Sequence, residues 1–379
     1  MNTKHIVFLI IVFTTLQSVS VFGQENTKAK LEIDSIKYFV GQDFVIIGRF
    51  HNEKNYNRFP QKYKNTVRPE VWELSQNSAG IAIRFRTNAT DIKIKWTTLF
   101  DAYLPHMAPT GVKGLDLYAN VNGTWQFVQT ARPKSKTSEY VMIENGEPVY
   151  REYLLNLPLY DGVDSLFIGV NESAEISKPK ERFMLDKKPV VYYGSSIAQG
   201  GCASRPGMAY TNILSRKLDR AFMNFGFSGE GTFDTSVGEA MLEVDAALYV
   251  IDCNPNTEVE LIYNKAVALV QQLKKAKPNV PVLLVENYNY TNALFKPKNS
   301  KKSGNSSPRE MCGEKQLELE KAYLTLMKSG VANLYFQKGV YLIGDDNEAT
   351  VDGVHLTDLG MQRFANAIYP QINTILQNP

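Results

Sequence analysis

The sequence predicts a two-domain α/β protein, in which an N-terminal β-sandwich precedes a three-layer α/β/α domain with a parallel five-stranded sheet. Three observations indicate this fold class. The chain has 379 residues, which is long for one hydrophobic core and favours two domains. Short segments that alternate apolar and polar residues fill the first half. From about residue 183 onward, apolar strands alternate with amphipathic helical patterns.

The first half, residues 24–182, contains the alternation expected of half-buried strands. An Asn122-Gly123 pair between two of the alternating segments is a strong signal for a β-hairpin. Many short strands separated by turns are typical of a sandwich. The predicted strands lie at 81–86, 92–96, 115–121, 125–128, 153–157 and 165–170.

The second half, residues 183–379, alternates buried strands with helices. Strands separated by helices pair in parallel through right-handed crossovers, so helices are expected on both faces of the sheet. The last helix is predicted at 358–376, and the polar stretch at 296–303 is predicted to be a surface loop. The five strands are predicted at 189–193, 221–226, 246–252, 280–286 and 333–337.

The first 23 residues have the features of an export signal. Lys4 and His5 precede an apolar stretch at 6–16, and Val21-Phe22-Gly23 offers a small-residue cleavage site. The apolar stretch is short for a membrane span, although an uncleaved anchor is the alternative. We therefore expect a soluble periplasmic or extracellular protein that does not insert into a membrane after cleavage. The net charge of +3 argues against nucleic acid as a partner.

The chain has three cysteines, Cys202, Cys253 and Cys312. In an oxidising compartment an odd number allows at most one bridge and leaves one thiol. Cys202 and Cys253 both follow predicted strands of one sheet, so a disulfide between them is one interpretation. Buried thiols are the other, and the sequence leaves both open.

Two short segments carry the chemistry. Gly194-Ser195-Ser196-Ile197 follows the first strand of the predicted parallel sheet, and Asp352-Gly353-Val354-His355 lies near the C-terminus. Reactive groups in such sheets lie beyond the carboxyl ends of the strands. A serine nucleophile needs a base of near-neutral pKa, which imidazole supplies, and a carboxylate that holds the correct tautomer. Ser196, His355 and Asp352 are therefore the candidate catalytic residues.

The same edge of the sheet offers donors for an oxyanion. Gly229 stands in the turn after the second strand, where a bare backbone can approach a substrate closely. Asn254 and Asn256 follow the third strand and offer side-chain amides. Either position is also compatible with a structural turn, because asparagine is common in turns.

In order and spacing, these residues resemble the SGNH/GDSL hydrolases from residue 187 to the end of the chain. The segment Gly114-Leu115-Asp116-Leu117-Tyr118 is similar to the GxDLY signature of the β-domain that precedes one branch of these enzymes, which resembles bacterial carbohydrate esterases. The resemblance implies a flavodoxin-like catalytic domain at 183–379 and a jelly-roll-like sandwich at 24–182.

The resemblance also implies roles for individual residues. Ser196 matches the nucleophile and an oxyanion donor, Gly229 matches the second donor, and His355 and Asp352 match the base and its partner. Ser195 departs from the family's Gly-Asp-Ser, and the third block departs from Gly-x-Asn-Asp. Direct alignment selects Asn254 as the third oxyanion donor, whereas the Asp-Cys-x-Pro-Asn pattern of this branch selects Asn256. We favour Asn256 and keep both.

The resemblance implies ester hydrolysis through an acyl-enzyme, without metal or cofactor. We expect an exported esterase that removes short acyl groups, above all acetyl, from a carbohydrate or another small ester. A lipase or lysophospholipase of the same superfamily and a glycan-binding protein with a degenerate hydrolase domain are the alternatives. His106, in a Pro/Gly-rich loop, Arg205, in the loop after Ser196, and Glu286, at the end of the fourth strand, are candidate substrate-binding residues. Each is also compatible with a purely structural role.

Overall fold

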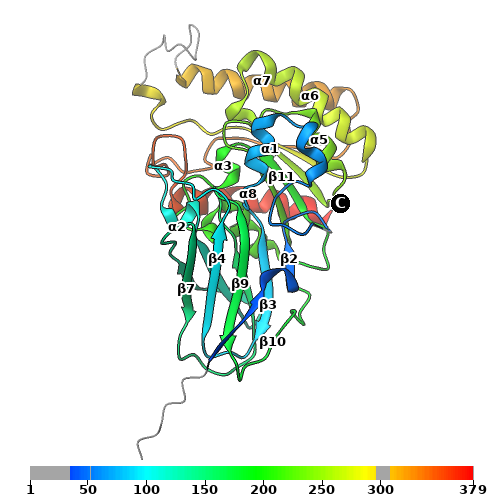
Figure 1. Cartoon of the computed structure of the whole chain (residues 1–379). Coiled ribbons are helices and arrows are strands. Elements are labelled where there is room, and N and C mark those ends of the chain that lie inside the picture. Colours follow the sequence, from blue (N-terminus) through cyan, green and yellow to red (C-terminus); the bar gives the residue numbers. More distant parts are fainter. Residues whose placement is uncertain (1–34, 52, 296–307, 379) are drawn as a thin grey trace, which may run out of the picture. The chain divides into compact units, whose positions relative to one another are not determined.

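Two antiparallel sheets make up most of the N-terminal half of the computed structural model, which describes residues 35–51, 53–295 and 308–378 (Figure 1). One sheet has the strand order β1-β9-β4-β7, and the other has the order β10-β3-β8-β5-β6 with β2 beside β3. Buried side chains from both sheets, such as Phe85 and Trp96, form one core, which confirms the predicted sandwich. The strands are β1 (Ile36–Val40), β2 (Val45–Ile47), β3 (Ala82–Thr87), β4 (Ile92–Thr98), β5 (Leu115–Val121), β6 (Thr124–Ala131), β7 (Thr137–Ile143), β8 (Arg151–Asn156), β9 (Val163–Asn171) and β10 (Ile176–Ser177).

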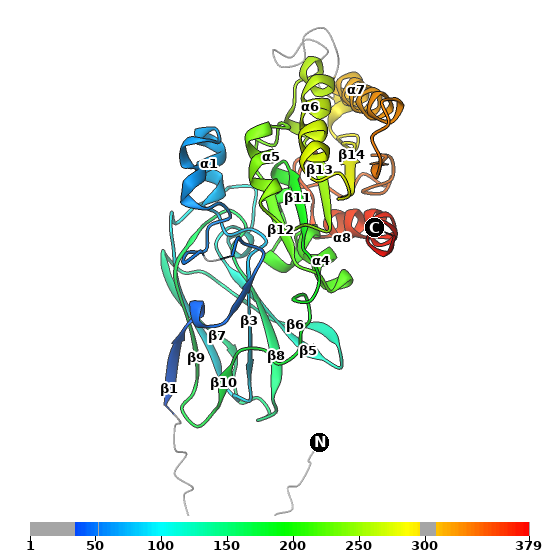
Figure 2. The same cartoon turned by 90° about the vertical axis from the view of Figure 1, so that its right-hand side faces the viewer.

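The N-terminal half also contains helical segments that we did not predict. These are α1 (Pro69–Ser75), α2 (Pro109–Val112) and short 3-10 turns at Gly41–Asp43 and Gln61–Asn65. Pro69 opens α1, where its missing N–H costs no hydrogen bond. Val71 and Trp72 of α1 pack in the same hydrophobic cluster as residues of the C-terminal sheet. Figure 2 shows α1 beside α5 (Thr235–Leu242).

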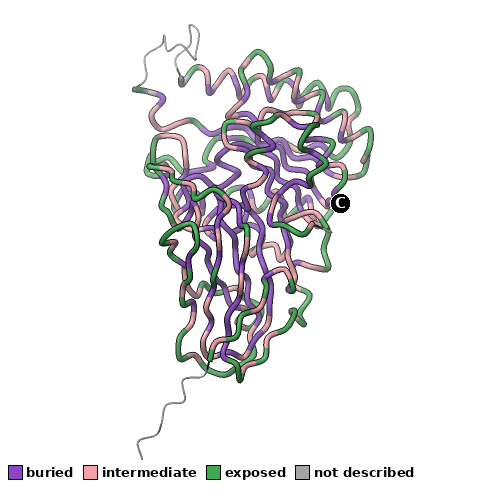
Figure 3. The backbone as a smooth tube through the Cα atoms, in the orientation of Figure 1, coloured by how far each residue is buried: buried purple, intermediate pink, exposed green. Residues whose placement is uncertain are grey.

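The C-terminal half is built on a parallel sheet of five strands in the order β12-β11-β13-β14-β15. The bounds agree with the predicted strands to within two residues at either end. Every residue of β11 to β14 is buried, as Figure 3 shows for the centre of this half. The strands are β11 (Val190–Gly194), β12 (Phe222–Gly226), β13 (Leu248–Asp252), β14 (Val282–Val285) and β15 (Leu334–Gln337).

Helices cover both faces of this sheet and complete the predicted three layers. Alternate strand residues, such as Val191 and Val190, enter two different hydrophobic clusters. The first cluster includes α5, α6 (Val259–Ala276) and α7 (Pro308–Lys328). The second includes α3 (Ser196–Gln199), α4 (Tyr210–Leu218) and α8 (Asp358–Gln377). Further 3-10 turns lie at Pro206–Met208, Asn254–Asn256 and Ala293–Phe295.

The structure does not contain the disulfide that was one interpretation of Cys202 and Cys253. Both are buried thiols. Cys253 packs in the cluster with α5 and α6, whereas Cys202 packs in the cluster with α3 and α8. The two side chains therefore lie on opposite faces of the sheet, although both follow the carboxyl ends of its strands. The predicted export signal and the polar stretch at 296–303 lie outside the described residues.

Candidate active site

Ser196 is the first residue of α3, directly after β11 has ended at Gly194. Ser195 caps this helix, because its Oγ accepts a hydrogen bond from the Ile197 N–H at 3.3 Å. The Ser196 side chain is nearly buried, with 6% of its surface exposed. The turn from strand to helix thus presents the Ser196 hydroxyl at the carboxyl edge of the sheet, the place where open α/β sheets bind ligands.

Ser196, His355 and Asp352 form a continuous chain of hydrogen bonds. The Ser196 Oγ lies 2.9 Å from the His355 Nε2, and the His355 Nδ1 lies 2.7 Å from the Asp352 Oδ2. With the carboxylate on Nδ1, the proton of the neutral ring sits on Nδ1, and Nε2 is free to accept the serine proton. The structure therefore brings together the three residues that we selected as catalytic.

Asp352 is held as a carboxylate by its own turn. Its Oδ1 accepts the backbone N–H groups of Val354 at 3.0 Å and His355 at 2.7 Å. Burial alone would raise the pKa of Asp352, but the hydrogen bonds from the His355 side chain and from these two backbone groups outweigh it and lower the pKa. The His355 ring therefore faces a charged partner throughout the neutral range.

The turn after β12 lies next to the nucleophile. Gly229 has a φ of +78°, a left-handed conformation that favours glycine, and it is exposed. Its N–H donates to no residue that the structure describes, which leaves it available to a substrate. A side chain at Gly231 would approach the carbonyl oxygen of Gly194 to 2.2 Å, so only glycine lets the turn pack against the end of β11.

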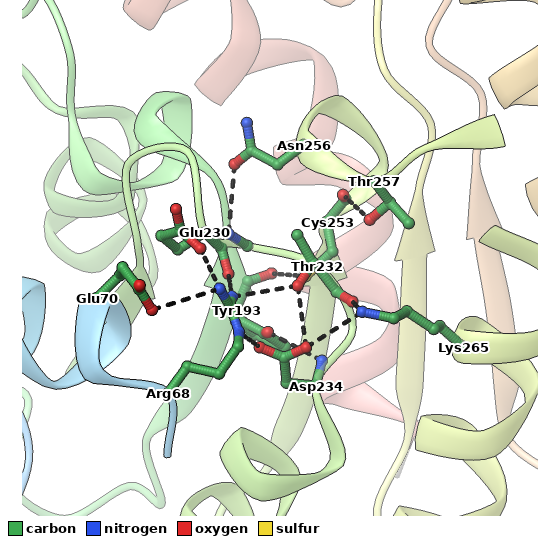
Figure 4. A network of polar contacts seen from close by, with 11 residues as sticks. Arg68, Glu70, Tyr193, Glu230, Thr232, Asp234, Cys253, Asn256, Thr257 and Lys265 are labelled. Atoms are coloured by element: carbon green, nitrogen blue, oxygen red, sulfur yellow. Dashed lines mark hydrogen bonds and ion pairs between the residues drawn. The ribbon is translucent and has the colours of Figure 1, made fainter. Parts of the chain in front are cut away.

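The two candidate amides occupy different environments. Asn254 is fully buried, and its Nδ2 donates to the Asn287 Oδ1 at 2.6 Å. Asn256 is partly exposed, and its Oδ1 accepts the Gly231 N–H at 3.3 Å. This bond turns the Asn256 Nδ2 away from the 227–231 turn, as Figure 4 shows. The Asn254 amide is therefore already used inside the protein, whereas no described residue accepts a hydrogen bond from the Asn256 Nδ2. Asn256 stays the preferred prediction for the third oxyanion donor, and Asn254 stays the alternative.

Arg68, at the start of α1, ties down the turn that carries Gly229. Its guanidinium pairs with the Glu230 carboxylate, donates to the Glu230 carbonyl oxygen at 2.9 Å and pairs with Asp234 at 2.9 Å (Figure 4). On the other side of the turn, the Ser228 N–H donates to the Gln199 Oε1 at 3.0 Å. Sequence reasoning missed Arg68, because nothing in its neighbourhood links it to a turn more than 150 residues away.

Arg58 is a buried cation directly beneath this turn. It donates to the backbone carbonyls of Asn224 at 3.2 Å and of Gly226 at the end of β12, and it lies 4.8 Å from the centre of the Phe227 ring. Its side chain bonds to carbonyl oxygens instead of a carboxylate, and burial lowers the pKa of Arg58 to about 9. The guanidinium stays charged at neutral pH, so it places a positive charge at the end of β12, beside the turn that carries Gly229.

Two loops of the sandwich reach the catalytic residues. The Tyr160 hydroxyl donates to the Ser196 carbonyl oxygen at 3.1 Å. The centre of the exposed His106 ring lies 5.6 Å from that of His355. His106 was a candidate substrate-binding residue and its position fits that role, whereas Tyr160 was missed.

Arg205 is bound by residues of the sandwich. Its guanidinium pairs with the fully buried Asp116 at 2.6 Å and donates to the Tyr118 hydroxyl at 2.6 Å. Asp116 also accepts the Gly207 N–H at 2.8 Å. Asp116 and Tyr118 thus join the sandwich to the loop after Ser196. The Arg205 guanidinium makes its ion pair and hydrogen bond in this contact.

Glu286 likewise has partners within the protein. It is 4% exposed, accepts the Gly339 N–H at 2.8 Å and pairs with Lys338 at 3.2 Å. Its carboxylate fixes the turn after β15. The charges of Arg205 and Glu286 are thus satisfied within the protein. These contacts favour the structural alternative for both residues, and their substrate roles stay untested predictions.

Comparison with known families gives two matches along the chain. Residues 187–373 match the GDSL-like lipase/acylhydrolase family, and residues 36–176 match the N-terminus of SGNH-hydrolase-type esterases, the GxDLY family. No curated protein matches the chain. Among the described residues, no helix is long and apolar enough to cross a membrane.

Several solved structures share the fold. A GDSL-like lipase from Bacteroides ovatus ATCC 8483 is 36% identical, with a TM-score of 0.84 over 90% of this chain and 98% of that one. A salicylyl-acyltransferase from a tetracycline biosynthetic pathway is 14% identical, with a TM-score of 0.72 over 90% of this chain and 97% of that one. A family two carbohydrate esterase from Clostridium thermocellum, in complex with cellohexaose, is 11% identical, with a TM-score of 0.55 over 79% of this chain and 93% of that one.

Proposed function

Because this chain belongs to the GDSL-like lipase/acylhydrolase family and carries the GxDLY N-terminus of SGNH-type esterases, we propose that it hydrolyses short acyl esters, above all O-acetyl groups on a carbohydrate. One observation carries the proposal. The Ser196 Oγ, the His355 ring and the Asp352 carboxylate are aligned at 2.9 Å and 2.7 Å. Aligned in this way, a hydroxyl becomes a nucleophile at neutral pH.

In the proposed reaction, the Ser196 Oγ attacks the acyl carbon while the His355 Nε2 accepts its proton. The negative charge then forms on the former carbonyl oxygen, near the N–H groups of Ser196 and Gly229 and the Asn256 Nδ2. Collapse of this intermediate releases the alcohol, which takes the proton from His355. A water molecule, deprotonated by the same ring, frees the acid and restores Ser196.

Support for a carbohydrate substrate comes from the loops around Ser196 and from the fold. The exposed His106 ring lies 5.6 Å from the His355 ring, and its polar nitrogens suit a sugar hydroxyl. A carbohydrate esterase that binds cellohexaose shares the fold. The family itself also includes lipases, so the acyl length and the alcohol have to be measured.

The experiment is hydrolysis of 4-nitrophenyl acetate and of longer 4-nitrophenyl esters, followed by acetate release from a panel of acetylated polysaccharides. We expect acetyl esters to be cleaved fastest, and Ser196→Ala to lower kcat by roughly 10³-fold or more. Faster cleavage of long-chain esters would favour a lipase. Wild-type activity in Ser196→Ala would exclude the nucleophile.

We also propose that the protein is exported, on the strength of the apolar stretch at 6–16 and the cleavage site at residue 23. Mass spectrometry of the protein recovered from the periplasm or medium tests this. A mature N-terminus at Gln24 is expected, and recovery of the full 379-residue chain in the cytoplasm would contradict it.

A further inference from the structure

Three side chains of the kinds that bind transition metals meet beside the catalytic residues. His106, Cys202 and His355 each offer one ligand atom, and these three atoms all lie within 4.8 Å of one another. In a tetrahedral zinc site, with ligands at about 2.0 to 2.3 Å from the metal, ligand atoms are about 3.3 to 3.8 Å apart. Movements of about one ångström would therefore bring the three atoms onto one ion.

The geometry of His355 determines which nitrogen is offered. Nδ1 is engaged by Asp352 at 2.7 Å, which leaves Nε2, the atom that lies 2.9 Å from the Ser196 Oγ. A carboxylate on the far nitrogen of a histidine is the arrangement that orients metal-binding histidines and raises their basicity. The catalytic pair is thus also a preformed metal ligand.

The two other ligands come from loops that are fastened to each other. Cys202 is 7% exposed, and its N–H donates to the Leu356 carbonyl oxygen at 3.3 Å, directly after His355. His106 belongs to the sandwich, and its loop is anchored where the Thr110 Oγ1 donates to the Ser204 carbonyl oxygen at 2.6 Å. These two hydrogen bonds hold the three loops next to one another, although the ligands come from distant parts of the sequence.

The charges also suit a divalent cation. Cys202 would bind the metal as a thiolate, the form in which cysteine ligates zinc. A bound ion replaces the thiol proton, which is released to water, and a thiolate–metal bond forms. The thiolate and the Asp352 carboxylate together then neutralise the two positive charges of the ion.

We propose that His106, Cys202 and His355 form a site for a thiophilic divalent cation such as Zn²⁺, and that the bound ion inhibits the enzyme. Two imidazoles and a thiolate are ligands that zinc prefers, and they leave a fourth position for water or the Ser196 Oγ. The ion takes the Nε2 lone pair that must accept the serine proton. Binding stands on the geometry alone, whereas inhibition rests on the proposed esterase function.

Cobalt(II) tests the binding by a readout that does not depend on activity. The full-length protein, freed of metal with a chelator, is titrated with Co²⁺ and its absorption spectrum is recorded. We expect one equivalent to produce visible d–d bands and a near-ultraviolet thiolate-to-cobalt band. Ser196→Ala and Cys253→Ser should keep the thiolate band. Ser196 is not one of the three proposed metal ligands, and Cys253 lies on the other face of the sheet. Cys202→Ser should lose it. A wild-type spectrum without that band, or one unchanged in Cys202→Ser, would overturn the site.

Zinc inhibition is then measured with 4-nitrophenyl acetate, and each variant is normalised to its own rate without zinc. We expect Zn²⁺ to inhibit the wild-type enzyme and a chelator to restore it, with the half-inhibitory concentration at least about tenfold higher in Cys202→Ser. Hydrolysis that is insensitive to Zn²⁺ would refute the inhibition. An absence of hydrolysis even without zinc would refute the esterase function and with it the inhibition, while the cobalt spectrum still decides whether the site exists.

Discussion

At the scale of single residues, Asp352 acts through the tautomer of His355. In Asp352→Asn the amide can donate to Nδ1, which shifts the ring proton to Nε2 and removes the base that faces Ser196. We expect kcat for 4-nitrophenyl acetate to fall by roughly 10³- to 10⁴-fold with little change in folding. Circular dichroism checks the fold. Asp346→Asn is a matched control, because Asp346 lies on the same loop and pairs with Arg363 instead. A loss of less than tenfold would contradict this role.

Asp252 makes the stability of the protein depend on pH, because its carboxyl is buried and pairs with no described cation. Its Oδ2 accepts the hydroxyls of Tyr192 at 3.2 Å and Tyr210 at 3.1 Å, and burial raises the pKa of Asp252 to about 8. The native state thus holds a proton that the unfolded chain releases above about pH 4. Its contribution to stability is present at low pH and is lost as the pH rises toward 8.

Asp252→Asn should remove this pH dependence. The free energy of unfolding of the variant, relative to wild type, is expected to rise between pH 5.5 and 8 by at most about 1.4 kcal/mol per pH unit. Urea unfolding at the two pH values measures it. Asp245→Asn is the control, since Asp245 is exposed and pairs with Lys188 at the surface. An identical difference between Asp252→Asn and wild type at both pH values would show that Asp252 is ionised throughout.

The residues that sequence reasoning found and missed differ in how local their signals are. Asp352 and His355 are three positions apart and Ser196 follows a buried strand, so their chemistry can be read from short segments. Arg205 has no such signal, because its partner, Asp116, comes from the other half of the chain. The disulfide interpretation failed for a related reason. Position after a strand fixes the edge of the sheet but leaves open which face the side chain joins.

At the scale of elements, the 227–231 turn depends on α1. Without Arg68, the Glu230 carboxylate and the neighbouring carbonyl lose their cation, and the N–H of Gly229 loses its fixed position. Complete loss of one oxyanion donor costs about 10²- to 10³-fold in kcat. For Arg68→Ala we therefore expect a fall of roughly tenfold in kcat with KM nearly unchanged.

Steady-state kinetics on 4-nitrophenyl acetate measures this effect. Arg68→Lys should lie between wild type and Arg68→Ala, because an ammonium can keep one of the two ion pairs. Lys62→Ala is the control, since Lys62 pairs with Glu243 away from the turn. An unchanged kcat in Arg68→Ala, or a rise in KM alone, would show that Arg68 does not position the donor.

The elements themselves were predicted well where periodicity is strong. The five parallel strands and the last helix were found because they are long and apolar, and because each crossover needs a helix. Helix α1 was missed, since its seven residues lie within a half dominated by alternating strands. Its Pro69 was a usable signal for a helix start. That α1 packs against the C-terminal sheet could not be predicted, because the docking depends on contacts between distant segments.

At the scale of the whole molecule, Asp116 and Arg205 connect the two halves. Asp116 is fully buried, so Arg205→Met would leave a carboxylate without its cation and should cost about 3 to 5 kcal/mol of stability. Adding Asp116→Asn should recover part of this loss. Chemical denaturation measures both, and Lys187→Met, which breaks a surface pair with Asp219, should cost at most about 1 kcal/mol.

Kinetics of the folded fraction separates this role from substrate binding. We expect KM for acetyl esters to stay the same in Arg205→Met, because its guanidinium is turned to the sandwich. A large rise in KM without a loss of stability would instead restore Arg205 as a substrate-binding residue.

The position of Arg58 has a practical consequence for anyone who trims or transplants this enzyme. The segment 187–373 holds the serine, the imidazole and both glycines, and it looks like a portable module. Yet the cation that binds the carbonyl oxygens at the end of β12 is Arg58, which lies between β2 and β3 of the N-terminal half. A fragment that begins at residue 187 would keep the reactive groups but lose Arg58, so the Asn224 and Gly226 carbonyls would lack their hydrogen-bond donor. The smallest unit to clone, fuse or evolve therefore includes Arg58 and the sandwich that holds it.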